Sequence, residues 1–577
     1  MDKKTIIFLS SLCFLLYFWG LGSTPFHDRG EPRESLVVSE MYGSGNWTLP
    51  LVNGEYIPYK PPLFHWIGII VASCLGRVNE FATRFPSALF ATLGVLLTYF
   101  AALKLWSENS ALIAAFVLAT NMEWWNAATI AQVDMTLAFF VTAALIYFMF
   151  VYGKKQVKPH ESIGIAILLA LAVLSKGPVG AALPVLVIFV YLLLRRDLAF
   201  VNQFNLVRGA FALILVAGSW YAAAGWQGGK AFFVRQIIEE SFSTAVASYG
   251  HYQPPYYLIP VLMTNLLPWS LFFPSLAFFI YKKRGRLDQE KLLFPIVWFL
   301  IVLLFFSLAR GKRGIYILPL YPSVALLFGA WWRELESRGI APAWYERWIG
   351  YYVAASALLA LVVASALLGG VEALNQPAFP HWARSLQVPV RYLEAIIPTR
   401  HIVVTCIALL GIGALLLIRG VTARAWNAVF IGLGTIALSQ GLATERAYYP
   451  SIAAQRTMKP FAERLSQEFD PESPLFFYRA YDYGVMFYSN RHLPQFPHNA
   501  KESVKVPFYL LMWEEQWNDL ADKPGLEVMD TSDGTGATGR HHMLLVRVTD
   551  TAALPRPADH PLKRPSQRSN GDEDEAS

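Results

Sequence analysis

Eight residues near the start of the chain, HDRGEPRE at positions 27–34, concentrate charge directly after an apolar segment. Six of the eight are ionisable. Carboxylates such as those of Asp28 and Glu31 can transfer a proton or orient a sugar hydroxyl. A guanidinium such as that of Arg33 binds phosphate through two parallel hydrogen bonds. The stretch therefore contains the groups needed for proton transfer beside a bound phosphate.

The composition of the whole chain indicates an integral membrane protein. Of 577 residues, 55% are hydrophobic and only 15% are charged, whereas soluble domains carry about 25% charged residues. The net charge of +7 comes from short loops between apolar runs, which is typical of membrane orientation and argues against a nucleic-acid partner. Cys13, Cys74 and Cys406 lie within apolar runs and have neither disulfide nor metal-ligand spacing.

About thirteen apolar segments are long enough to be membrane-spanning helices. Residues 5–22 are interpreted as a first anchor, because no clear small-residue cleavage site follows them. Residues 60–76 are shorter and interrupted by polar side chains, so we expect an amphipathic helix at the interface. The expected spans are residues 5–22, 86–105, 108–122, 133–152, 162–175, 178–195, 207–225, 256–281, 292–309, 314–332, 350–370, 401–419 and 424–441.

The loop charges predict the orientation and the domain organisation. With the N-terminus in the cytoplasm, lysines and arginines fall on the inner side in loop after loop. We therefore expect a transmembrane domain at residues 1–441, whose first external loop at 23–85 carries the active site, and an external domain at 442–550. The residues from 551 to 577 are rich in proline and charge, and we expect them to be disordered.

Sequence patterns predict a small α/β fold for the external domain. The residues "RTMKPFAERLSQEF" place apolar side chains at helical spacing. The runs "SPLFFY", "VPFYLLMW" and "HHMLLVRV" are typical of short buried strands.

This orientation leaves several charged residues on the outer face, where few basic residues are expected. Ionisable groups at a helix boundary are costly unless they are paired or functional. Besides positions 27–34, these outer residues are Lys60, Asp134, Lys176, His251, Arg310, Lys312 and Arg313.

Each outer residue alone has an ordinary structural explanation. A single lysine such as Lys60 can extend to lipid headgroups, Asp134 can cap a helix, and Lys176 precedes a Gly-Pro turn. His251 can be an ordinary loop histidine and is only a possible substrate contact. Together, however, cations from several loops on one face suit a phosphate or diphosphate, and carboxylates beside them suit sugar chemistry.

The order of motifs resembles bacterial membrane glycosyltransferases of the ArnT-like and protein O-mannosyltransferase-like kind. The first external loop contains "GEPRESLVVSEMYGSGNWTLPLVNGEYIPYKPPLFHW". The runs "VDMTLAFF", "LSKGPVG", "NLLPWSLFFP" and "RGKRGIYILPLYPSVALL" follow in the family's order. The resemblance covers about residues 5–440, and it is specific as an ordered set although each motif alone is weak.

The resemblance implies a GT-C fold with an external active site and a sugar donor linked to polyprenyl phosphate. It implies that Arg33 and Lys60 bind the donor phosphate and that Asp134 orients substrate. Lys176 with Arg310, Lys312 and Arg313 would complete this phosphate site or hold an anionic acceptor, for example lipid A in an aminoarabinose-type modifier. Such cations would stabilise the departing polyprenyl phosphate.

One departure from the family pattern leaves the catalytic base open. The family's first acid, in an Asp-Glu pair, is replaced by Gly30, while Glu31 keeps the second. Glu31 is our first candidate for the base and Asp28 the second. A third reading needs no base, because a phosphate acceptor is already an anionic nucleophile. The family's acid before Lys-Pro-Pro is also replaced, by Tyr59.

The sequence thus predicts an inverting glycosyltransferase with a lipid or glycan acceptor on the outer face of the inner membrane. A protein O-mannosyltransferase-like enzyme is the nearer alternative. A lipid or ion transporter is the more distant one, because transporters place charges near the bilayer midplane and contain repeated halves. A catalytically inactive binding protein is also consistent with Gly30. No cofactor is expected to be tightly bound, and a divalent-metal requirement is left open.

Overall fold

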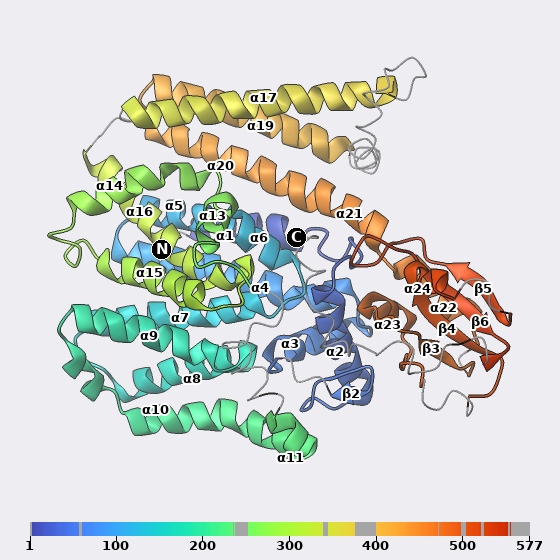
Figure 1. Cartoon of the computed structure of the whole chain (residues 1–577). Coiled ribbons are helices and arrows are strands. Elements are labelled where there is room, and N and C mark those ends of the chain that lie inside the picture. Colours follow the sequence, from blue (N-terminus) through green and yellow to red (C-terminus); the bar gives the residue numbers. More distant parts are fainter. Residues whose placement is uncertain are drawn as a thin grey trace. The chain divides into compact units, whose positions relative to one another are not determined.

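The computed structural model consists of two compact units, each assembled from separate parts of the chain (Figure 1). It describes residues 3–56, 60–234, 236, 252–338, 344–374, 400–470, 472–497, 504–520, 524–551 and 554. The helical unit comprises residues 1–19, 86–226 and 253–449, and the mixed unit comprises residues 20–85, 227–252 and 450–577. These two units are defined by contacts between residues. The domains predicted from the sequence were instead defined by chain order and membrane side, and their boundaries stay a prediction.

The helical unit contains most of the long apolar helices, but residues 80–85 of α4 (Glu80–Leu105), which include Glu80 and Arg84, belong to the mixed unit. Each of the thirteen expected spans coincides with a helix or a broken pair of helices in the described residues. These elements are α1 (Lys3–Cys13), η1 (Phe14–Phe18), α4 (Glu80–Leu105), α5 (Glu108–Ala119), α6 (Met122–Thr129), α7 (Asp134–Gly153), α8 (Pro159–Lys176), α9 (Val179–Leu194), η2 (Leu198–Gln203), α10 (Leu206–Leu213), η3 (Ile214–Gly218), α11 (Ser219–Phe233), α13 (Leu258–Asn265), η5 (Trp269–Phe272), α14 (Phe273–Lys282), α15 (Leu293–Leu308), η6 (Gly314–Leu320), α16 (Tyr321–Arg338), α17 (Trp344–Leu374), α19 (Arg400–Thr422), α20 (Trp426–Ala443) and η9 (Thr444–Tyr448).

Fewer of these helices qualify as spans than the sequence predicts. By length and composition, seven helices in the described residues could cross a membrane, or eight if α13 and α14, bent by 108°, form one broken span. Four further apolar helices in the described residues are only 10–17 residues long, namely α3 (Leu63–Leu75), α5, α9 and α15. Short helices and bends therefore divide several of the predicted segments.

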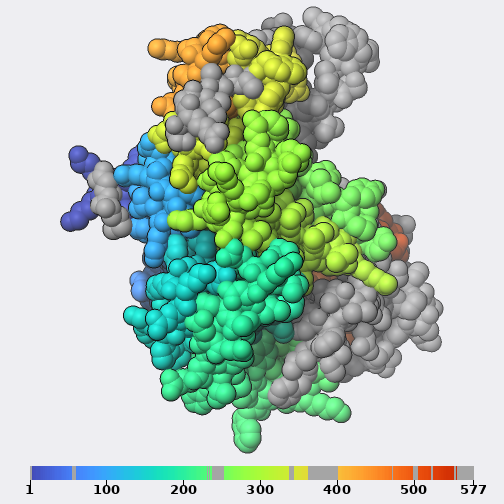
Figure 2. Space-filling model, turned by 90° about the vertical axis from the view of Figure 1, so that its left-hand side faces the viewer, coloured from blue at the N-terminus to red at the C-terminus, as the bar shows by residue number. Residues whose placement is uncertain are grey.

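Apolar side chains on the outer helices are exposed, as a lipid environment requires. The segment Leu206–Lys230, which includes α10 and most of α11, is only 11% buried over its most apolar window. It is coloured green in Figures 1 and 2. Its exposed side chains are Leu206, Val207, Phe211, Ile214, Leu215 and Trp226.

The mixed unit joins the loop after the first apolar segment to the C-terminal segment through one hydrophobic core. Its elements are α2 (Gly30–Ser44), β1 (Leu51–Val52), β2 (Glu55–Tyr56), α3 (Leu63–Leu75), α21 (Tyr449–Arg456), α22 (Lys459–Glu468), β3 (Leu475–Phe477), α23 (Tyr483–Ser489), β4 (Phe508–Trp513), α24 (Glu514–Asn518), β5 (Leu526–Thr531) and β6 (Met543–Val548). Val38 and Met41 of α2 share a core with Phe461 of α22 and Met486 of α23. The two segments, far apart in sequence, therefore bury their apolar faces against each other.

The predicted α/β character of the C-terminal segment is confirmed. Strands β3, β4, β5 and β6 form one sheet in the order β3-β4-β6-β5, in which β3 and β4 are parallel and the other pairs are antiparallel. Three of the strands lie in the runs identified from sequence, and β5 was missed. The predicted disordered tail lies almost entirely outside the described residues.

Helices α19 and α20 pack closely at glycines (Figure 1). A Cβ on Gly432 would lie 2.8 Å from the carbonyl oxygen of Gly413 and 2.8 Å from the amide nitrogen of Leu417. Both are backbone atoms and cannot move aside. Small residues at membrane-helix contacts permit this approach.

We predict that Gly432→Ala lowers the thermal unfolding temperature in detergent. Overpacking of a rigid contact costs about 1–3 kcal/mol, which is a loss of several degrees. The matched control is Gly153→Ala, because no heavy atom lies within 4 Å of the Cβ position there. Equal unfolding temperatures for the two variants would contradict this prediction.

Candidate functional site

The predicted site residues fall into two sets, one in each unit. Asp28, Glu31, Arg33 and Lys60 belong to the mixed unit. The remaining described ones belong to the helical unit, namely Asp134, Lys176, Arg310, Lys312 and Arg313. His251 and Tyr59 lie outside the described residues. Each set is described within its own unit.

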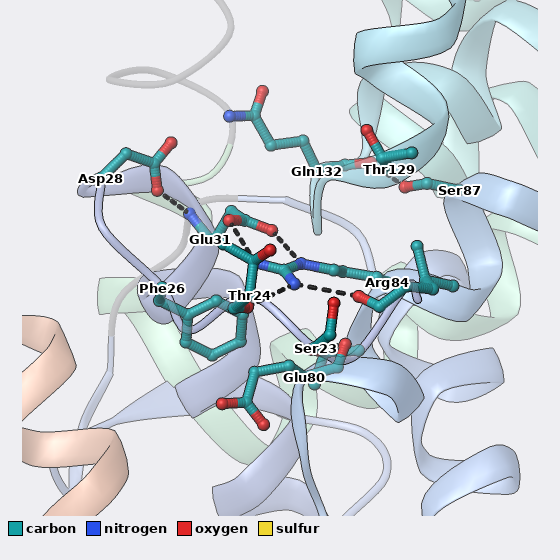
Figure 3. A network of polar contacts seen from close by, with 12 residues as sticks. Ser23, Thr24, Phe26, Asp28, Glu31, Glu80, Arg84, Ser87, Thr129 and Gln132 are labelled. Atoms are coloured by element: carbon teal, nitrogen blue, oxygen red, sulfur yellow. Dashed lines mark hydrogen bonds and ion pairs between the residues drawn. The ribbon is translucent and has the colours of Figure 1, made fainter. Parts of the chain in front are cut away.

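Glu31 is held in a buried ion pair with Arg84 of α4 (Figure 3). The Glu31 carboxylate accepts from Nε of Arg84 at 2.7 Å and from Nη2 at 2.9 Å. Glu31 is 1% exposed and Arg84 is 4% exposed. A two-point pair of this kind fixes both side chains. The first candidate for the base is therefore held by a buried cation.

Arg84 also fixes the loop that precedes α2. Its Nη1 donates to the carbonyl oxygens of Leu21, at 2.9 Å, and Thr24, at 2.7 Å. The guanidinium carbon lies 5.1 Å from the ring centre of Phe26. One side chain thus organises the whole turn from residue 21 to residue 31.

Asp28 lies at the N-terminus of α2. Its Oδ1 accepts a hydrogen bond of 2.9 Å from the backbone N–H of Glu31 (Figure 3). Backbone N–H groups in a helix's first turn have no partner within the helix, and an acidic side chain there is stabilised by the helix dipole. Asp28 is half-buried, so the second candidate for the base is both fixed and partly accessible.

Arg33 is oriented by a chain of buried groups. Its Nη2 donates to Oε1 of Glu34 at 2.9 Å, and Oε2 of Glu34 lies 2.9 Å from Nε2 of His65. Burial raises the pKa of the Glu34 carboxyl, but Arg33 and His65 outweigh this and bring it down to about 2. Glu34 is therefore ionised at every physiological pH and holds the Arg33 guanidinium in one orientation.

Lys60, the other predicted phosphate ligand in the mixed unit, has a partly buried side chain.

In the helical unit, Asp134 and Lys176 form an ion pair between the first residue of α7 and the last of α8. Both side chains are largely buried, at 11% and 14% exposure. The Lys176 Nζ atom also lies 4.5 Å from the ring centre of Tyr316 on η6. Three elements thus meet at this pair, which brings together two of the predicted site residues.

A second carboxylate, that of Glu123 on α6, interacts electrostatically with Asp134 of this pair. Asn265, the last residue of α13, donates to its Oε2 at 2.7 Å. Burial, and then the charge of Asp134, raise the pKa of Glu123 from 4.5 to about 7, although Arg313 and the Asn265 hydrogen bond oppose the rise. Glu123 therefore changes its charge near neutral pH.

The three cations before η6 differ in exposure. Lys312 is 2% exposed, and its ammonium donates to the carbonyl oxygens of Gln253, at 2.8 Å, and Pro254, at 3.3 Å. Burial lowers its pKa. Arg310 and Arg313 are exposed. Lys312 thus holds the backbone at Gln253 and Pro254 through hydrogen bonds, whereas the two arginines carry their charge at the surface.

A family model described as dolichyl-phosphate-mannose-protein mannosyltransferase matches residues 59–221. An uncharacterised protein of Aquifex aeolicus (strain VF5) is 31% identical over 331 residues, which cover 57% of this chain and 73% of that protein. An undecaprenyl phosphate-alpha-4-amino-4-deoxy-L-arabinose arabinosyl transferase of Pectobacterium carotovorum is 30% identical over 379 residues. That match covers 64% of this chain and 65% of the enzyme, slightly less than two thirds of the relative's length.

The crystal structure of ArnT from Cupriavidus metallidurans bound to undecaprenyl phosphate has the same fold. Its TM-score is 0.73 at 21% identity, and the match covers 96% of this chain and 100% of that one. The chain is thus similar in sequence to ArnT-like membrane glycosyltransferases and shares the fold of ArnT. The expected GT-C fold is confirmed, and the chain is a multi-pass protein of the bacterial inner membrane.

Several partners in this ArnT-like chain were missed from sequence. Arg84 and Glu123 lie beside or within helical segments without a charge pattern or a family motif to mark them, and Asn265 begins the run "NLLPWSLFFP" but carries no charge. Their contacts span 53 residues for Arg84 with Glu31 and 142 for Asn265 with Glu123. The sequence does not show which residues these side chains contact in the folded protein, and this is why they were missed. Within the described ranges, no three His, Cys, Asp or Glu side chains are grouped as metal ligands would be.

We predict that the Glu31–Arg84 pair behaves as a buried ion pair in a double-mutant cycle. Glu31→Leu and Arg84→Leu should each lower the free energy of unfolding by about 3–5 kcal/mol, because each leaves a buried charge unpaired. The double variant should lose much less than the sum, as measured by denaturant unfolding. Arg464→Leu is the control, since its pair with Asp530 is about one-third exposed and such pairs contribute about 0–1 kcal/mol. Additive losses would show that the pair is not coupled.

We also predict that Glu123 makes stability fall as pH rises from about 4.5 to about 7. In this window the folded protein binds more protons than the unfolded chain, so raising the pH costs at most about 3 kcal/mol. Glu123→Gln should remove this slope, giving a smaller loss of unfolding temperature between pH 5 and pH 8 than the wild type. Glu108→Gln, at an exposed residue, should keep the wild-type slope. Identical slopes for all three proteins would exclude a raised pKa at Glu123.

Proposed function

We propose that this protein is an inverting glycosyltransferase that moves a sugar from a polyprenyl-phosphate donor to a lipid or glycan acceptor outside the inner membrane. The observation that carries the proposal is Arg33, whose guanidinium is oriented by Glu34 and His65 beside a carboxylate, Asp28, at the N-terminus of the same helix. An oriented guanidinium suits a phosphate, and the carboxylate suits the reacting sugar.

The relatives support a lipid-linked donor. One carries the name of an undecaprenyl phosphate-aminoarabinose arabinosyl transferase, and the structure of similar fold is bound to undecaprenyl phosphate. In the proposed reaction the acceptor oxygen attacks the anomeric carbon, the bond from that carbon to the phosphate oxygen breaks, and polyprenyl phosphate leaves. Arg33 and Lys60 would stabilise the negative charge that develops on the phosphate. Lys176, Arg310, Lys312 and Arg313 would complete the phosphate site or hold an anionic acceptor, with Asp134 orienting substrate.

The geometry reverses the order of the two candidates for the base. Both oxygens of Glu31 accept from Arg84, so protonation of Glu31 would leave a buried cation unpaired. Asp28 uses one oxygen to cap α2 and is partly accessible. We therefore assign the base to Asp28 when the acceptor is a hydroxyl, and Glu31 supports the turn that carries it. A phosphate acceptor would need neither.

A protein O-mannosyltransferase-like activity is the second candidate, because the matching family model over residues 59–221 carries that description. For either activity we propose a cytoplasmic N-terminus and an external C-terminal domain, as the loop charges predict. His251 remains a proposed substrate contact.

The test is reconstitution in vesicles with a panel of polyprenyl-phosphate sugars, measuring release of polyprenyl phosphate and labelling of lipid A or peptide acceptors. With a hydroxyl acceptor, Asp28→Asn should lower kcat by about 10²–10⁴-fold, the usual contribution of a general base. Arg33→Ala should raise the donor KM. Asp519→Asn, at an exposed residue of the external domain, is the control and should retain the wild-type rate.

Three outcomes would contradict parts of this proposal. Ligand flux across the vesicle without release of polyprenyl phosphate would favour a transporter. Labelling of peptides alone would favour the mannosyltransferase-like reading. Full activity in both Asp28→Asn and Glu31→Gln would show that neither acts as a base.

A further inference from the structure

Tyr488 of α23 contacts the turn that carries the proposed catalytic groups. Its hydroxyl oxygen accepts a hydrogen bond of 2.8 Å from the backbone N–H of Phe26. The same hydroxyl donates to Oε1 of Glu80, on α4, at 3.0 Å. A phenol has one donor and can also accept, so both bonds can form at once. A single side chain of the C-terminal segment thus links Phe26 to the first turn of α4.

The ring of Phe26 is enclosed from two sides. It lies 5.2 Å from the ring centre of Phe487 and 5.7 Å from that of Tyr488. The Arg84 guanidinium carbon lies 5.1 Å from the Phe26 ring centre, and Phe26 is 2% exposed. Figure 3 shows Phe26 on the turn that leads to Asp28 and Glu31, with the side chains of Arg84 and Glu80 coming from α4. Phe26 is therefore held both by its ring and by its backbone.

Tyr488 is itself held in place. Lys459 of α22 donates to the same Glu80 oxygen at 2.8 Å, and its ammonium lies 5.2 Å from the Tyr488 ring centre. Glu80 is 6% exposed. Burial, and then the charge of Glu80, raise the pKa of Tyr488, so the phenol keeps its proton and remains a donor.

The segment that carries Tyr488 is also held by further hydrogen bonds and by core packing. These contacts keep the Tyr488 hydroxyl in place. Asn53 exchanges two hydrogen bonds with the backbone of Leu493, at 2.7 and 2.8 Å. The core shared by α2, α22 and α23 surrounds Met486, two residues before Tyr488. A support that cannot itself move can hold a reacting group in its productive geometry.

We propose that Tyr488 is a positioning residue for the turn at residues 21–31, so that the C-terminal segment is a working part of the active site. The proposal rests on the proposed function in one respect, namely that Asp28 on this turn acts on the substrate. The physical link from the Tyr488 hydroxyl to the Phe26 amide is independent of that function. The two can therefore be tested separately.

The test compares Tyr488→Phe with the wild type in two measurements. Hydrogen exchange of peptides covering residues 22–32 should become about tenfold faster or more at Phe26, because its amide loses its acceptor. Turnover with the donor found active should fall about tenfold in kcat with an unchanged donor KM, since loss of positioning affects the reacting geometry and not phosphate binding. The ring remains, so exchange in β4 and β6 should stay as in the wild type and shows that the domain is folded.

Tyr509→Phe is the matched control. Tyr509 lies on β4 of the same unit, and its ring packs against Phe469 at 4.3 Å between ring centres. This variant removes the same hydroxyl group from another tyrosine and should leave both measurements at wild-type values.

Unchanged exchange at residues 22–32 in Tyr488→Phe overturns the proposal whatever the activity. Faster exchange with unchanged kcat also overturns it, because the bond would then order the turn without serving turnover. If the wild type releases polyprenyl phosphate from no donor, the proposed function fails, and the exchange measurement still decides whether Tyr488 holds the turn.

Discussion

The buried pair between Arg84 and Glu31 is the interaction on which the mixed unit depends most directly. A guanidinium has five donors and cannot lose its proton in a protein. Burying it is costly unless its hydrogen-bonding groups are satisfied. Arg84 meets this requirement with the Glu31 carboxylate and two backbone carbonyls. Because Arg84 lies in residues 80–85 of α4, which belong to the mixed unit, it ties the turn between residues 21 and 31 to that end of the helix.

Charge pairing of the same kind organises the helical unit. Asp134 and Lys176 lie at the ends of successive helices, where an isolated charge would be expensive in a membrane protein. Their pairing, with the Tyr316 ring close to the ammonium, joins the start of α7 to the end of α8. The charge of Asp134 acts on Glu123. At high pH the two carboxylates therefore carry more negative charge than Lys176 alone neutralises.

Sequence reasoning was strong for features that repeat along the chain and weak for contacts between distant residues. Apolar runs predicted the place of a helix or broken helix pair at each expected span, but not that several of these helices are shorter than the about 20 residues of a full span. Strand β5 was missed because Glu527 and Asp530 interrupt its apolar character and most of its side chains are exposed. Arg84 lies in "EFATRFPSALF", where a single arginine beside an apolar run gives no sign of its partner. The pairing becomes visible only when residues 53 positions apart are brought together.

The C-terminal segment shows the same limit. Its strands were identifiable as short apolar runs, but nothing in "YDYGVMFYSN" indicates that Tyr488 contacts Phe26, 462 residues earlier. Nor does the sequence show that α2 and α22 contribute to one core. Chain order suggested a membrane domain followed by a separate external one, whereas contacts group the first loop with the C-terminal segment.

At position 30, the residue type affects the chemistry of the site but is not required by the backbone conformation. Where the family pattern implied by the resemblance has an aspartate, this chain begins α2 with a glycine, and Gly30 is not among the described glycines with positive φ. The backbone therefore gives no conformational reason for glycine at this position. What glycine removes is a carboxylate next to Glu31, and a second carboxylate there would have added negative charge beside a carboxylate that Arg84 already balances. Asp28, bound to the first turn of the same helix, supplies a carboxylate at the same helix end without that added repulsion, which is why the loss of the family's aspartate leaves the proposed chemistry possible.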